Sequence, residues 1–423
     1  MGNLTAIADT GVLLEHLFRH QAGRMVAHLA RLLGPAHLDL AEETVQETML
    51  RALQAWPYQG VPANAAAWLF RVAHNVAIDA VRRNRMAGDK TDAILAELSR
   101  SAASVPDDPD IEEQLRDDEL RMIFMCCHPE ISRDASVALS LKTVGGFSVR
   151  EIARAFLVDD TAIAQRLVRA KRQIREQHLT LDMPHGADLK RRLDSALEVI
   201  YFIFNEGYAA HAGEDLIRQD LCFEALRLAS LVVSSSIVTP PVHALMALMA
   251  FQAARLPARV DASGDIVLLE GQDLARWDRQ LIGLGFHHFN QSMAGDDVSE
   301  YHAQAAIAAT YSNAPDAQSI DWPVILSLYD HLLSINPSPV VALNRAVAVA
   351  KVHGPVEALA AIEPLGDDPK LRDYYLLPAV RGHLLLELGR RGEAAACFRS
   401  ALEYPCSEPE RRFLKRKLDQ CER

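Results

Sequence analysis

The sequence predicts an all-α protein, and three observations support this fold class. Apolar residues recur at helical spacing through most of the 423-residue chain, and few segments alternate as strands do. Gly and Pro residues divide this pattern into helices of ordinary length. The composition is that of a soluble globular protein, with 49% hydrophobic and 24% charged residues.

The net charge limits the kind of nucleic-acid binding to expect. At −12, it argues against non-specific coating of nucleic acid, because the whole chain would repel phosphates. The charge is uneven, however: residues 160–176 carry a local net charge of +3 and residues 89–119 one of −8. A local basic face at 160–176 is therefore still compatible with DNA binding.

Cysteine usage and the chain start exclude several classes of protein. The six cysteines form no CxxC pair, and Cys126-Cys127 followed by His128 lacks metal-ligand spacing. We expect buried thiols in a reducing compartment, with no metal and no cofactor. The start shows no signal-peptide pattern, and no apolar run approaches the roughly 18 residues that span a membrane. We therefore expect a cytoplasmic protein with no membrane partner.

Residues 11–85 form the first helical part, with breaks at Gly34-Pro35 and between Pro57 and Pro62. The segment 41–53, AEETVQETMLRAL, has two faces at helical spacing. One face carries Ala41, Val45, Thr48 and Ala52, and the other carries Glu43, Gln46, Glu47 and Arg51. By itself the polar face is also what a plain solvated surface looks like.

The segment 67–85, AWLFRVAHNVAIDAVRRNR, predicts an amphipathic helix. Its apolar side carries Leu69, Val72, Ala73 and Val76, and its polar side carries Arg71, Asn75 and Arg82. Arg and Asn side chains bind phosphates and base edges. Trp56, Tyr58 and Trp68 flank the helix, and aromatic rings beside a basic face suit unstacked bases. Core packing is the alternative for these rings, above all for Trp68.

Residues 86–118 combine the acidic surplus with Gly, Ser and Pro, which indicates a linker with a short helix near 94–98. Helical periodicity resumes over 119–182. Ser148 and Glu151 form a capping-box pattern for a helix Val149–Phe156, and a second helix is predicted from Asp159 or Asp160.

The second helix predicts a helix-turn-helix with an exposed polar face. Ile163, Leu167, Ala170 and Ile174 face inward, and Thr161, Gln165, Arg169 and Arg172 face the other way. Donors on such a face suit the major groove of DNA. A helical hairpin with an exposed basic face is the alternative.

Residues 188–423 are also mostly helical. Gly354 with Glu357-Ala358 recurs as Gly389 with Glu393-Ala394, near the 34-residue period of tetratricopeptide repeats, although coincidental hairpins give the same pattern. Two interpretations are open for the polar residues Asn205, Glu206, Tyr208 and Asp220. Their polar groups satisfy one another in a core, or they form a pocket or docking surface. The acidic residues around Gly264 lack the spacing of a calcium loop and are interpreted as an ordinary acidic loop.

These segments, in this order, resemble the extracytoplasmic-function sigma factors of bacterial RNA polymerase. AEETVQETMLRAL and AWLFRVAHNVAIDAVRRNR are similar to region 2 of that family, and EIA at 151–153 with RLVRAKRQIR at 166–175 is similar to region 4.2. Further segments resemble a subgroup with a tetratricopeptide-like C-terminal extension that regulates in cis. These are IYFIFNEGY at 200–208, DLCFEALRLA at 220–229, RVDASGDIVLLEGQD at 259–273, RWDRQLI at 276–282 and SPVVALNRAVAVA at 338–350.

The resemblance implies the partners and the residues that contact them. The partners are core polymerase, through its β′ clamp helices and β flap, and promoter DNA. Core docking is carried over to Glu43, Gln46, Glu47 and Arg51; recognition of the −10 element to Asn64, Arg71, Asn75, Arg82 and Arg83; and recognition of the −35 element to Thr161, Gln165, Arg166, Arg169 and Arg172.

The implied organisation is region 2 at 11–85, a flexible acidic linker at 86–118, region 4 at 119–182, and a helical module at 188–423 with repeats near 338–421. The module offers a surface for a regulatory protein or ligand. No P-loop, Gly-x-Ser-x-Gly or HExxH motif is present, so we expect no enzyme. The alternative function is a one-component regulator, whose helix-turn-helix binds an operator and whose helical module binds a ligand or protein.

Overall fold

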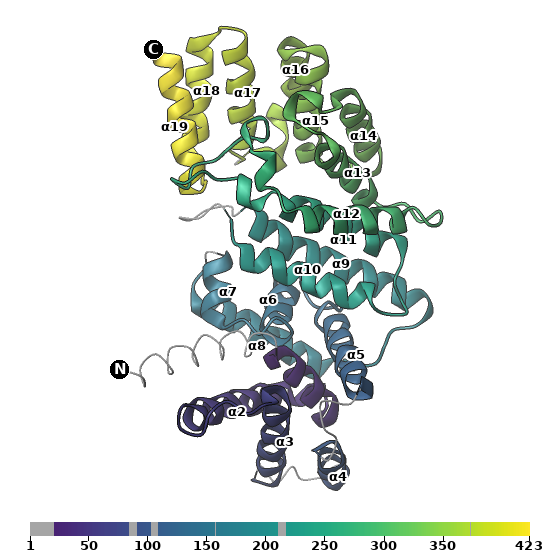
Figure 1. Cartoon of the computed structure of the whole chain (residues 1–423). Helices are drawn as coiled ribbons and strands as arrows, with labels where there is room; N and C mark the ends of the chain where they lie inside the picture. The colour runs from purple at the N-terminus through teal and green to yellow at the C-terminus, as the bar shows by residue number, and fades with distance from the viewer. Residues whose placement is uncertain (1–20, 84–90, 103–108, 157, 210–216, 373) are drawn as a thin grey trace. The chain divides into compact units, whose positions relative to one another are not determined.

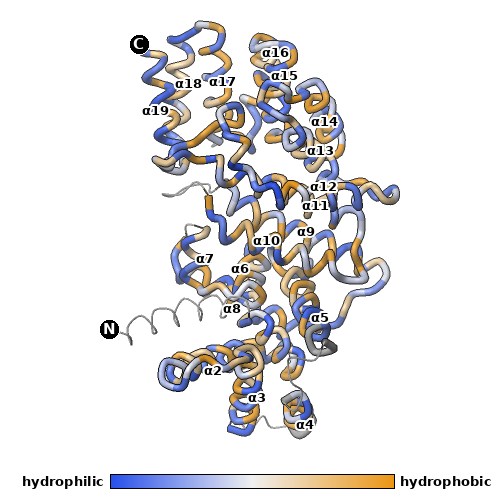
Figure 2. Tube along the Cα trace, in the orientation of Figure 1, coloured by the Kyte–Doolittle hydropathy of each residue, from blue (hydrophilic) through white to orange (hydrophobic). Residues whose placement is uncertain are grey.

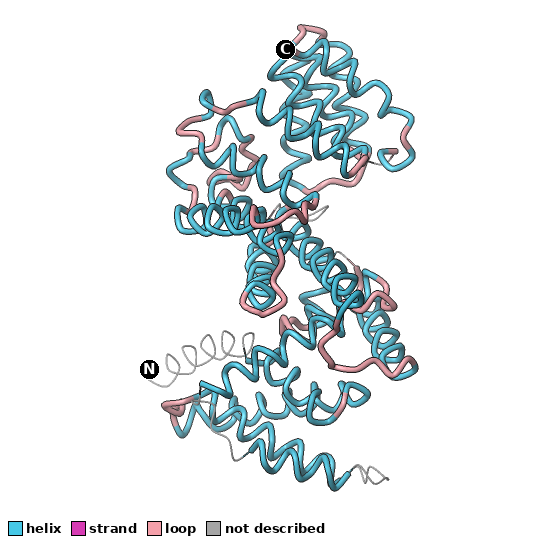
Figure 3. Tube along the Cα trace, turned by 90° about the vertical axis from the view of Figure 1, so that its right-hand side faces the viewer, coloured by secondary structure: helices cyan, strands magenta, loops and turns pink. Residues whose placement is uncertain are grey.

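The computed structural model describes residues 21–83, 91–102, 109–156, 158–209, 217–372 and 374–423. Within these ranges the regular elements are helices, apart from one isolated antiparallel bridge between Val260 and Ile266 (Figure 3). The predicted all-α fold class is confirmed. The chain divides into two compact units, Met1–Ile200 and Tyr201–Arg423.

The first unit begins with a helical stretch at 21–33 and continues as a series of short and medium helices (Figure 1). They are η1 (Pro35–His37), α2 (Leu38–Gln59), α3 (Ala65–Arg83), α4 (Thr91–Ala102), α5 (Pro109–Cys126), α6 (Arg133–Thr143), α7 (Val149–Phe156), α8 (Asp160–Glu176) and the first part of α9 (Gly186–Tyr208).

Helices α2 and α3 pack against each other through the faces predicted as apolar. Ala41, Val45, Thr48 and Ala52 are all buried on α2, as are Leu69, Ala73 and Val76 on α3. Helix α2 continues through Pro57 and ends at Gln59, and the C-cap residue Gly60 has a φ of 81°, in the left-handed region that glycine adopts without strain. The predicted break between Pro57 and Pro62 therefore falls after Gln59.

The acidic segment between the two sigma-like parts is more helical than predicted. Helix α4 covers the short helix expected near 94–98, and α5 begins at Pro109, ahead of the predicted start at 119. A buried polar network that includes Ser101 of α4 and Asp118 of α5 holds these helices. Propensity favours a linker here because acidic residues, Ser and Pro dominate, but tertiary contacts decide the outcome.

Helices α7 and α8 confirm the predicted helix-turn-helix in detail. The amide N–H of Ser148 donates to Glu151 Oε2 at 2.7 Å, and the Glu151 amide donates to Ser148 Oγ at 3.1 Å, which is the predicted capping box. Helix α7 has the predicted bounds, and α8 begins at Asp160 after Asp159 as N-cap residue. The buried face of α8 consists of the four predicted residues, Ile163, Leu167, Ala170 and Ile174.

Helix α9 runs without a break through the boundary between the two units at Ile200. Its first part belongs to the first unit: Arg192 is 7% exposed and donates to the Phe124 carbonyl at 3.1 Å, and Glu198 pairs with Arg133 at 3.0 Å. The two compact units therefore divide after Ile200, inside α9.

The second unit is a succession of helical hairpins (Figure 1). Its helices are α10 (Gln219–Val233), α11 (Pro240–Ala254), α12 (Arg279–Ser292), α13 (Glu300–Asn313), α14 (Trp322–Ile335), α15 (Pro339–His353), α16 (Pro355–Ile362), α17 (Leu376–Glu387), α18 (Arg391–Glu403) and α19 (Glu408–Glu422). Short 3-10 turns, η2 to η7, lie between 256 and 371. Hydrophobic and hydrophilic residues alternate along most helices in Figure 2, as expected of amphipathic helices.

The weak internal repeat corresponds to two helical hairpins. Gly354, with φ 96°, joins α15 to α16, and Gly389, with φ 74°, lies between α17 and α18. Each glycine takes the left-handed conformation that a tight helix–helix turn requires. The repeated Glu-Ala pair follows in the first turns of α16 and α18.

The acidic loop around Gly264 uses its carboxylates to hold other parts of the second unit. Asp265 Oδ1 accepts from Arg412 Nε of α19 at 2.6 Å and also pairs with Arg416, and Glu270 pairs with Lys351 at 2.5 Å. Asp261 Oδ1 accepts from the amide of Ser263 within the loop. The interpretation as an ordinary acidic loop agrees with these contacts.

The cysteines are free thiols, and five of the six are buried. Burial raises the pKa of Cys126 and raises that of Cys127 to about 12, which keeps both protonated at neutral pH. In the described part of the chain, no helix combines the length and the apolar character needed to cross a membrane.

Candidate nucleic-acid interface

The exposed face of α2 carries the predicted docking residues. Glu43, Gln46, Glu47 and Arg51 are all exposed, and Arg51 Nε donates to Glu47 Oε1 at 2.9 Å. An exposed i,i+4 pair of this kind contributes only about 0.3–0.5 kcal/mol to stability. These four side chains therefore remain available to a partner.

Two exposed leucines on α2 complete this face, and the sequence interpretation missed them. Leu50 is 52% exposed and Leu53 is 44% exposed. With Gln46 they follow the helical spacing 0, 4, 7, so the pattern was present in the sequence. A polar face with two exposed leucines is typical of a surface that a protein partner covers.

The polar face of α3 is exposed as predicted. Arg71, Asn75, Arg82 and Arg83 are all exposed, and Arg83 Nε donates to the Asp79 carbonyl at 3.3 Å. Neither Arg71 nor Arg82 makes an ion pair with another residue that the structure describes. Unpaired guanidinium groups on one helix face can bind phosphates and base edges.

The aromatic residues around the start of α3 are of two kinds, packed and exposed. Trp56 is 2% exposed and meets Trp68 edge to face, with ring centroids 5.4 Å apart, so these rings pack in the core. Tyr58 is 89% exposed and can stack on a base. Asn64 Oδ1 accepts from the Ala67 amide at 2.8 Å and caps α3, so its carbonyl oxygen already has a structural role.

The exposed face of α8 carries four of the five residues predicted to read DNA. Thr161, Gln165, Arg169 and Arg172 are exposed on one side of the helix. The fifth, Arg166, is half-buried, and its Nη2 lies 3.5 Å from Asp134 Oδ2 of α6. Arg166 therefore contacts its own domain, because it lies beside the buried Leu167 at the edge of the apolar face, and its role toward DNA stays a prediction.

The inner edge of α8 contacts the start of α2, which the sequence did not predict. Lys171 Nζ donates to Asp39 Oδ1 at 2.8 Å and to Glu42 Oε2 at 2.9 Å. Arg175 Nη1 lies 3.2 Å from Asp39 Oδ2. The side chains of Lys171 and Glu42 are only 11% and 12% exposed.

The pKa values of this contact reflect two opposing effects. Burial by itself lowers the pKa of Lys171, but Glu42 and Asp39 reverse this and leave the pKa raised. Burial by itself raises the pKa of Asp39, but Lys171 and Arg175 leave that pKa lowered. Lys171 and Asp39 therefore stay charged at neutral pH.

A buried polar network joins the helical stretch 21–33 to α5. His28 Nδ1 lies 2.9 Å from Asp118 Oδ2, and Arg31 Nε lies 2.9 Å from Asp118 Oδ1. His28 Nε2 and His74 Nε2 each lie 3.0 Å from Ser101 Oγ of α4. The network fixes α4 and α5, and explains why the acidic segment is helical.

The proposed surface of the C-terminal module is not formed as one surface. Glu206 is 7% exposed and lies 3.8 Å from Arg218, and the Tyr208 ring lies 3.8 Å from the guanidinium carbon of Arg259. Asn205 hydrogen-bonds Tyr201, whereas Asp220 is exposed on α10. Glu206 and Tyr208 therefore contact arginines of their own module rather than one another, and a role of the four residues in a pocket or docking surface stays a prediction.

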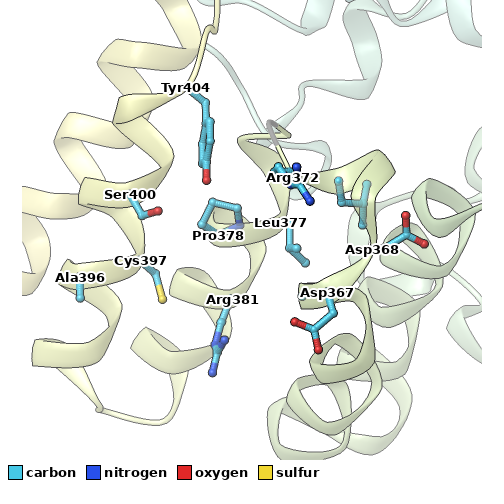
Figure 4. A pocket seen from close by; sticks show the side chains of 12 residues that line it. Asp367, Asp368, Arg372, Leu377, Pro378, Arg381, Ala396, Cys397, Ser400 and Tyr404 are labelled. Atoms are coloured by element: carbon cyan, nitrogen blue, oxygen red, sulfur yellow. The ribbon is translucent and has the colours of Figure 1, made fainter.

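A cavity of about 600 Å³ lies elsewhere in the second unit, between η6, η7, α17 and α18 (Figure 4). Arg372, Arg381, Ser400 and Tyr404 line it, together with apolar side chains such as Leu377. No residue singled out from the sequence lines this cavity. Its mixed polar and apolar lining is typical of a small-ligand or peptide site.

Three family models match successive parts of the chain. The model described as sigma-70 region 2 matches residues 17–86, and sigma-70, region 4 matches residues 121–174. A family of unknown function, DUF6596, matches residues 192–293.

Relatives are found both over nearly the whole chain and over its first part. An uncharacterized protein of Rhizobium meliloti is 40% identical over 90% of each chain. The ECF RNA polymerase sigma factor SigL of Mycobacterium tuberculosis is 28% identical over 40% of this chain and 91% of its own. The ECF RNA polymerase sigma factor SigE of Mycolicibacterium smegmatis is 28% identical over 38% of this chain and 60% of its own. No solved structure matches the chain.

Proposed function

The chain belongs to the extracytoplasmic-function sigma factors and carries a C-terminal DUF6596 extension, and we propose which of its surfaces contact polymerase and which contact promoter DNA. Its sigma domains bind core RNA polymerase and promoter DNA. We propose three surfaces. The docking face is Glu43, Gln46, Glu47, Leu50, Arg51 and Leu53; the −10 face is Tyr58, Arg71, Asn75, Arg82 and Arg83; the −35 face is Thr161, Gln165, Arg169 and Arg172.

The observation that carries this proposal is the exposure of all three faces on helices whose opposite sides are buried. On α2 the docking face lies opposite the buried Ala41 and Val45, so a partner can reach it without unfolding the helix. On α8 the −35 face lies opposite the buried Ile163 and Leu167. A helix held rigidly by its apolar side presents its polar side in a fixed geometry, which specific recognition requires.

The −10 face combines the two elements needed to hold melted DNA. Arg71 and Arg82 attract the phosphate backbone, and the exposed ring of Tyr58 offers a stacking surface for an unpaired base. An operator-binding regulator needs no surface of this kind. The α2–α3 pair and the region 2 match therefore favour a sigma factor over the one-component regulator.

Transcription in vitro with purified core polymerase tests the docking face. We expect the full-length chain to start transcription at specific promoters. Glu47→Lys should weaken core binding at least about fivefold, or about 1 kcal/mol, because it reverses a charge in the face.

Glu113→Lys is the matched control, since Glu113 is an exposed glutamate on α5 outside the three faces. Equal core affinity of the two variants, with both folded, would remove the docking role of Glu47. Failure of the wild-type chain to support any transcription would contradict the whole proposal.

We also propose that the C-terminal module regulates the sigma domains in cis. The support is the continuity of the chain, because α9 carries residues of both units and the DUF6596 match at residues 192–293 follows the region 4 match at residues 121–174. The cavity lined by Arg372 and Tyr404 is a candidate site for the regulatory ligand or protein.

A chain ending after residue 209 tests the regulation, because this cut keeps α9 whole. A cut at 185 would instead remove Leu193, Leu197 and Ile200, which are buried. We expect the truncated chain to show altered promoter-dependent transcription, in the direction of reduced activity. Transcription equal to that of the full-length chain, at matched amounts of folded protein, would contradict regulation in cis.

A further inference from the structure

The cavity between η6, η7, α17 and α18 carries charged side chains of both signs (Figure 4). Arg372 follows η7, and Arg381 lies on α17. Asp367 ends η6, and Asp368 follows it. Within the described part of the chain, neither arginine makes an ion pair, although the two aspartates line the same cavity. The cavity therefore offers positive and negative groups that do not neutralise one another.

A neighbouring arginine shows that exposed charges in this part of the chain can pair. Arg390, just before α18, lies 2.6 Å from Glu393. At the cavity the backbone holds one carboxylate in place instead, since Asp368 Oδ1 accepts from the Lys370 amide at 2.8 Å and caps η7. The charges of the cavity therefore stay separate for a structural reason.

The wall of the cavity is partly apolar and tightly packed. Leu371 is 3% exposed, and Leu377 and Pro378 of α17 line the cavity with it. Helices α17 and α18 approach closely, because a Cβ atom added to Gly382 would lie 3.1 Å from the Phe398 ring. A wall packed in this way keeps its shape without a ligand, so the site is preformed.

Two hydroxyl groups complete the lining on the side of α18. Ser400 lies on α18 and Tyr404 follows it, and both side chains are half-buried (Figure 4). A hydroxyl group donates to a carboxylate and accepts from an ammonium group. These two side chains can therefore orient a ligand that carries either group.

We infer that this cavity binds a small zwitterion of the amino-acid class, with a carboxylate, an ammonium group and an apolar side chain. Arg372 and Arg381 bind the carboxylate, and Asp367 and Asp368 attract the ammonium group. The inference rests on the proposed function of the cavity as the ligand site of the C-terminal module. Its volume of about 600 Å³ lies within the range of roughly 300–1,000 Å³ typical of small-molecule sites.

The lining distinguishes a zwitterion from simpler ligands. An inorganic anion would meet the two arginines but would be repelled by the two aspartates. A wholly apolar ligand would cover four charged groups without giving them a partner. A ligand with both charges and an apolar body matches every part of the lining.

Titration calorimetry on the full-length chain tests the ligand class with L-leucine and two blocked derivatives. Leucinamide lacks the carboxylate, and N-acetyl-L-leucine lacks the ammonium group. We expect L-leucine to bind at least about tenfold more tightly than either derivative, because each blocked group leaves charged side chains without a partner. Leucyl-leucine is the fourth probe, and tighter binding of this dipeptide would support the zwitterion site and identify a short peptide as the source.

Neutral variants assign the two charges of the ligand. In Arg372→Gln/Arg381→Gln, L-leucine should bind no more tightly than leucinamide. In Asp367→Asn/Asp368→Asn, it should bind no more tightly than N-acetyl-L-leucine, and an asparagine at 368 can still cap η7. Arg399→Gln, at an exposed position of α18 outside the cavity, is the matched control and should bind as the wild type does.

Cys397 gives a second measurement at the cavity itself. It lines the cavity and is half-buried, whereas the other five cysteines are buried. With L-leucine at ten times its Kd, reaction of Cys397 with N-ethylmaleimide should slow about tenfold, because bound ligand covers the thiol. Mass spectrometry of the labelled peptide measures this rate.

Three results would overturn the inference. They are no binding of L-leucine or leucyl-leucine, equal affinity for L-leucine and both derivatives, and an unprotected Cys397 when calorimetry shows L-leucine bound. Each leaves the sigma-factor function intact, because none involves polymerase or promoter DNA. Failure of the wild-type chain to support transcription would instead contradict the proposed function, whatever the cavity binds.

Discussion

Helices α8 and α11 have similar lengths, but α8 is mostly exposed to solvent and α11 is mostly buried. Helix α8 has 17 residues and buries four of them, whereas α11 has 15 residues and buries twelve. Helix α11 contacts α10, α12 and α13, so most of its surface is covered by the second unit. Helix α8 is covered on one side only and presents arginines on the other.

The difference separates a helix that builds a core from a helix that meets a partner. A helix that is apolar all round is stable only inside a domain, and one with a narrow apolar stripe keeps a face for another molecule. Substitutions in α11 should therefore change stability, and substitutions on the exposed face of α8 should change binding.

The largest expected effect is on the stability of the second unit. Phe251 of α11 is fully buried and meets Phe286 edge to face at 4.9 Å. Phe251→Ala should lower the free energy of unfolding by about 3–5 kcal/mol, through lost burial and the cavity left behind. Denaturant unfolding followed by circular dichroism measures it. Val168→Ala on α8, where Val168 is 64% exposed, should change stability by less than about 0.5 kcal/mol. Similar losses in the two variants would remove the distinction between the helices.

The second expected effect is on the pH dependence of stability, through one buried histidine in each unit. Burial, with smaller contributions from neighbouring charges, lowers the pKa of His74 and of His288 to about 4. The unfolded chain, with an ordinary pKa near 6.5, binds more protons below that pH than the folded chain does. The free energy of unfolding should therefore fall between about pH 6.5 and 4, by about 1–3 kcal/mol for each histidine.

Unfolding measured at several pH values checks this titration. His288→Gln should flatten the pH dependence of the second unit and leave that of the first unit as it was, and His74→Gln should do the reverse. His185→Gln is the control, since His185 is exposed. An unchanged pH dependence in both variants would show that neither histidine is held neutral by the fold.

The third effect is on promoter binding through α8. Arg169→Ala should weaken binding by about 1–3 kcal/mol, or roughly 5–150-fold, at one base pair of the −35 element if it reads a base edge. A similar loss across all sequences would indicate a phosphate contact. Arg116→Ala, at an exposed position of α5, is the matched control for a lost positive charge. Binding by Arg169→Ala equal to that of the control would place the −35 face elsewhere.

Short-range patterns predicted the elements of both sigma domains well. The Ser148–Glu151 capping box, the start of α8 at Asp160 and its four buried residues all follow from contacts within one or two helical turns. The polar faces of α2 and α3 follow from the same periodicity. Leu50 and Leu53 lie in the same pattern, but helical spacing alone does not say that an apolar residue beside a charged face stays exposed.

Other features were beyond a single-sequence interpretation because they depend on distant residues. Asp118 of α5 meets His28 from 90 positions away, and Ser101 of α4 meets His28 and His74, in a segment whose composition indicates a linker. Glu206 and Tyr208 are close in sequence, but their contacts are with Arg218 and Arg259, which lie 12 and 51 positions away.

The sequence by itself determined the all-α fold, the helix-turn-helix and the faces that its helices expose. Periodicity, caps and turn glycines act within a few residues, so they can be read locally. Only the tertiary structure decided that Lys171 meets Asp39 and Glu42 across 132 and 129 residues, and that α9 joins the two units as one helix. The physical reason is that an ion pair between helices forms only after apolar packing has brought those helices together, and no local pattern encodes which charged faces then meet.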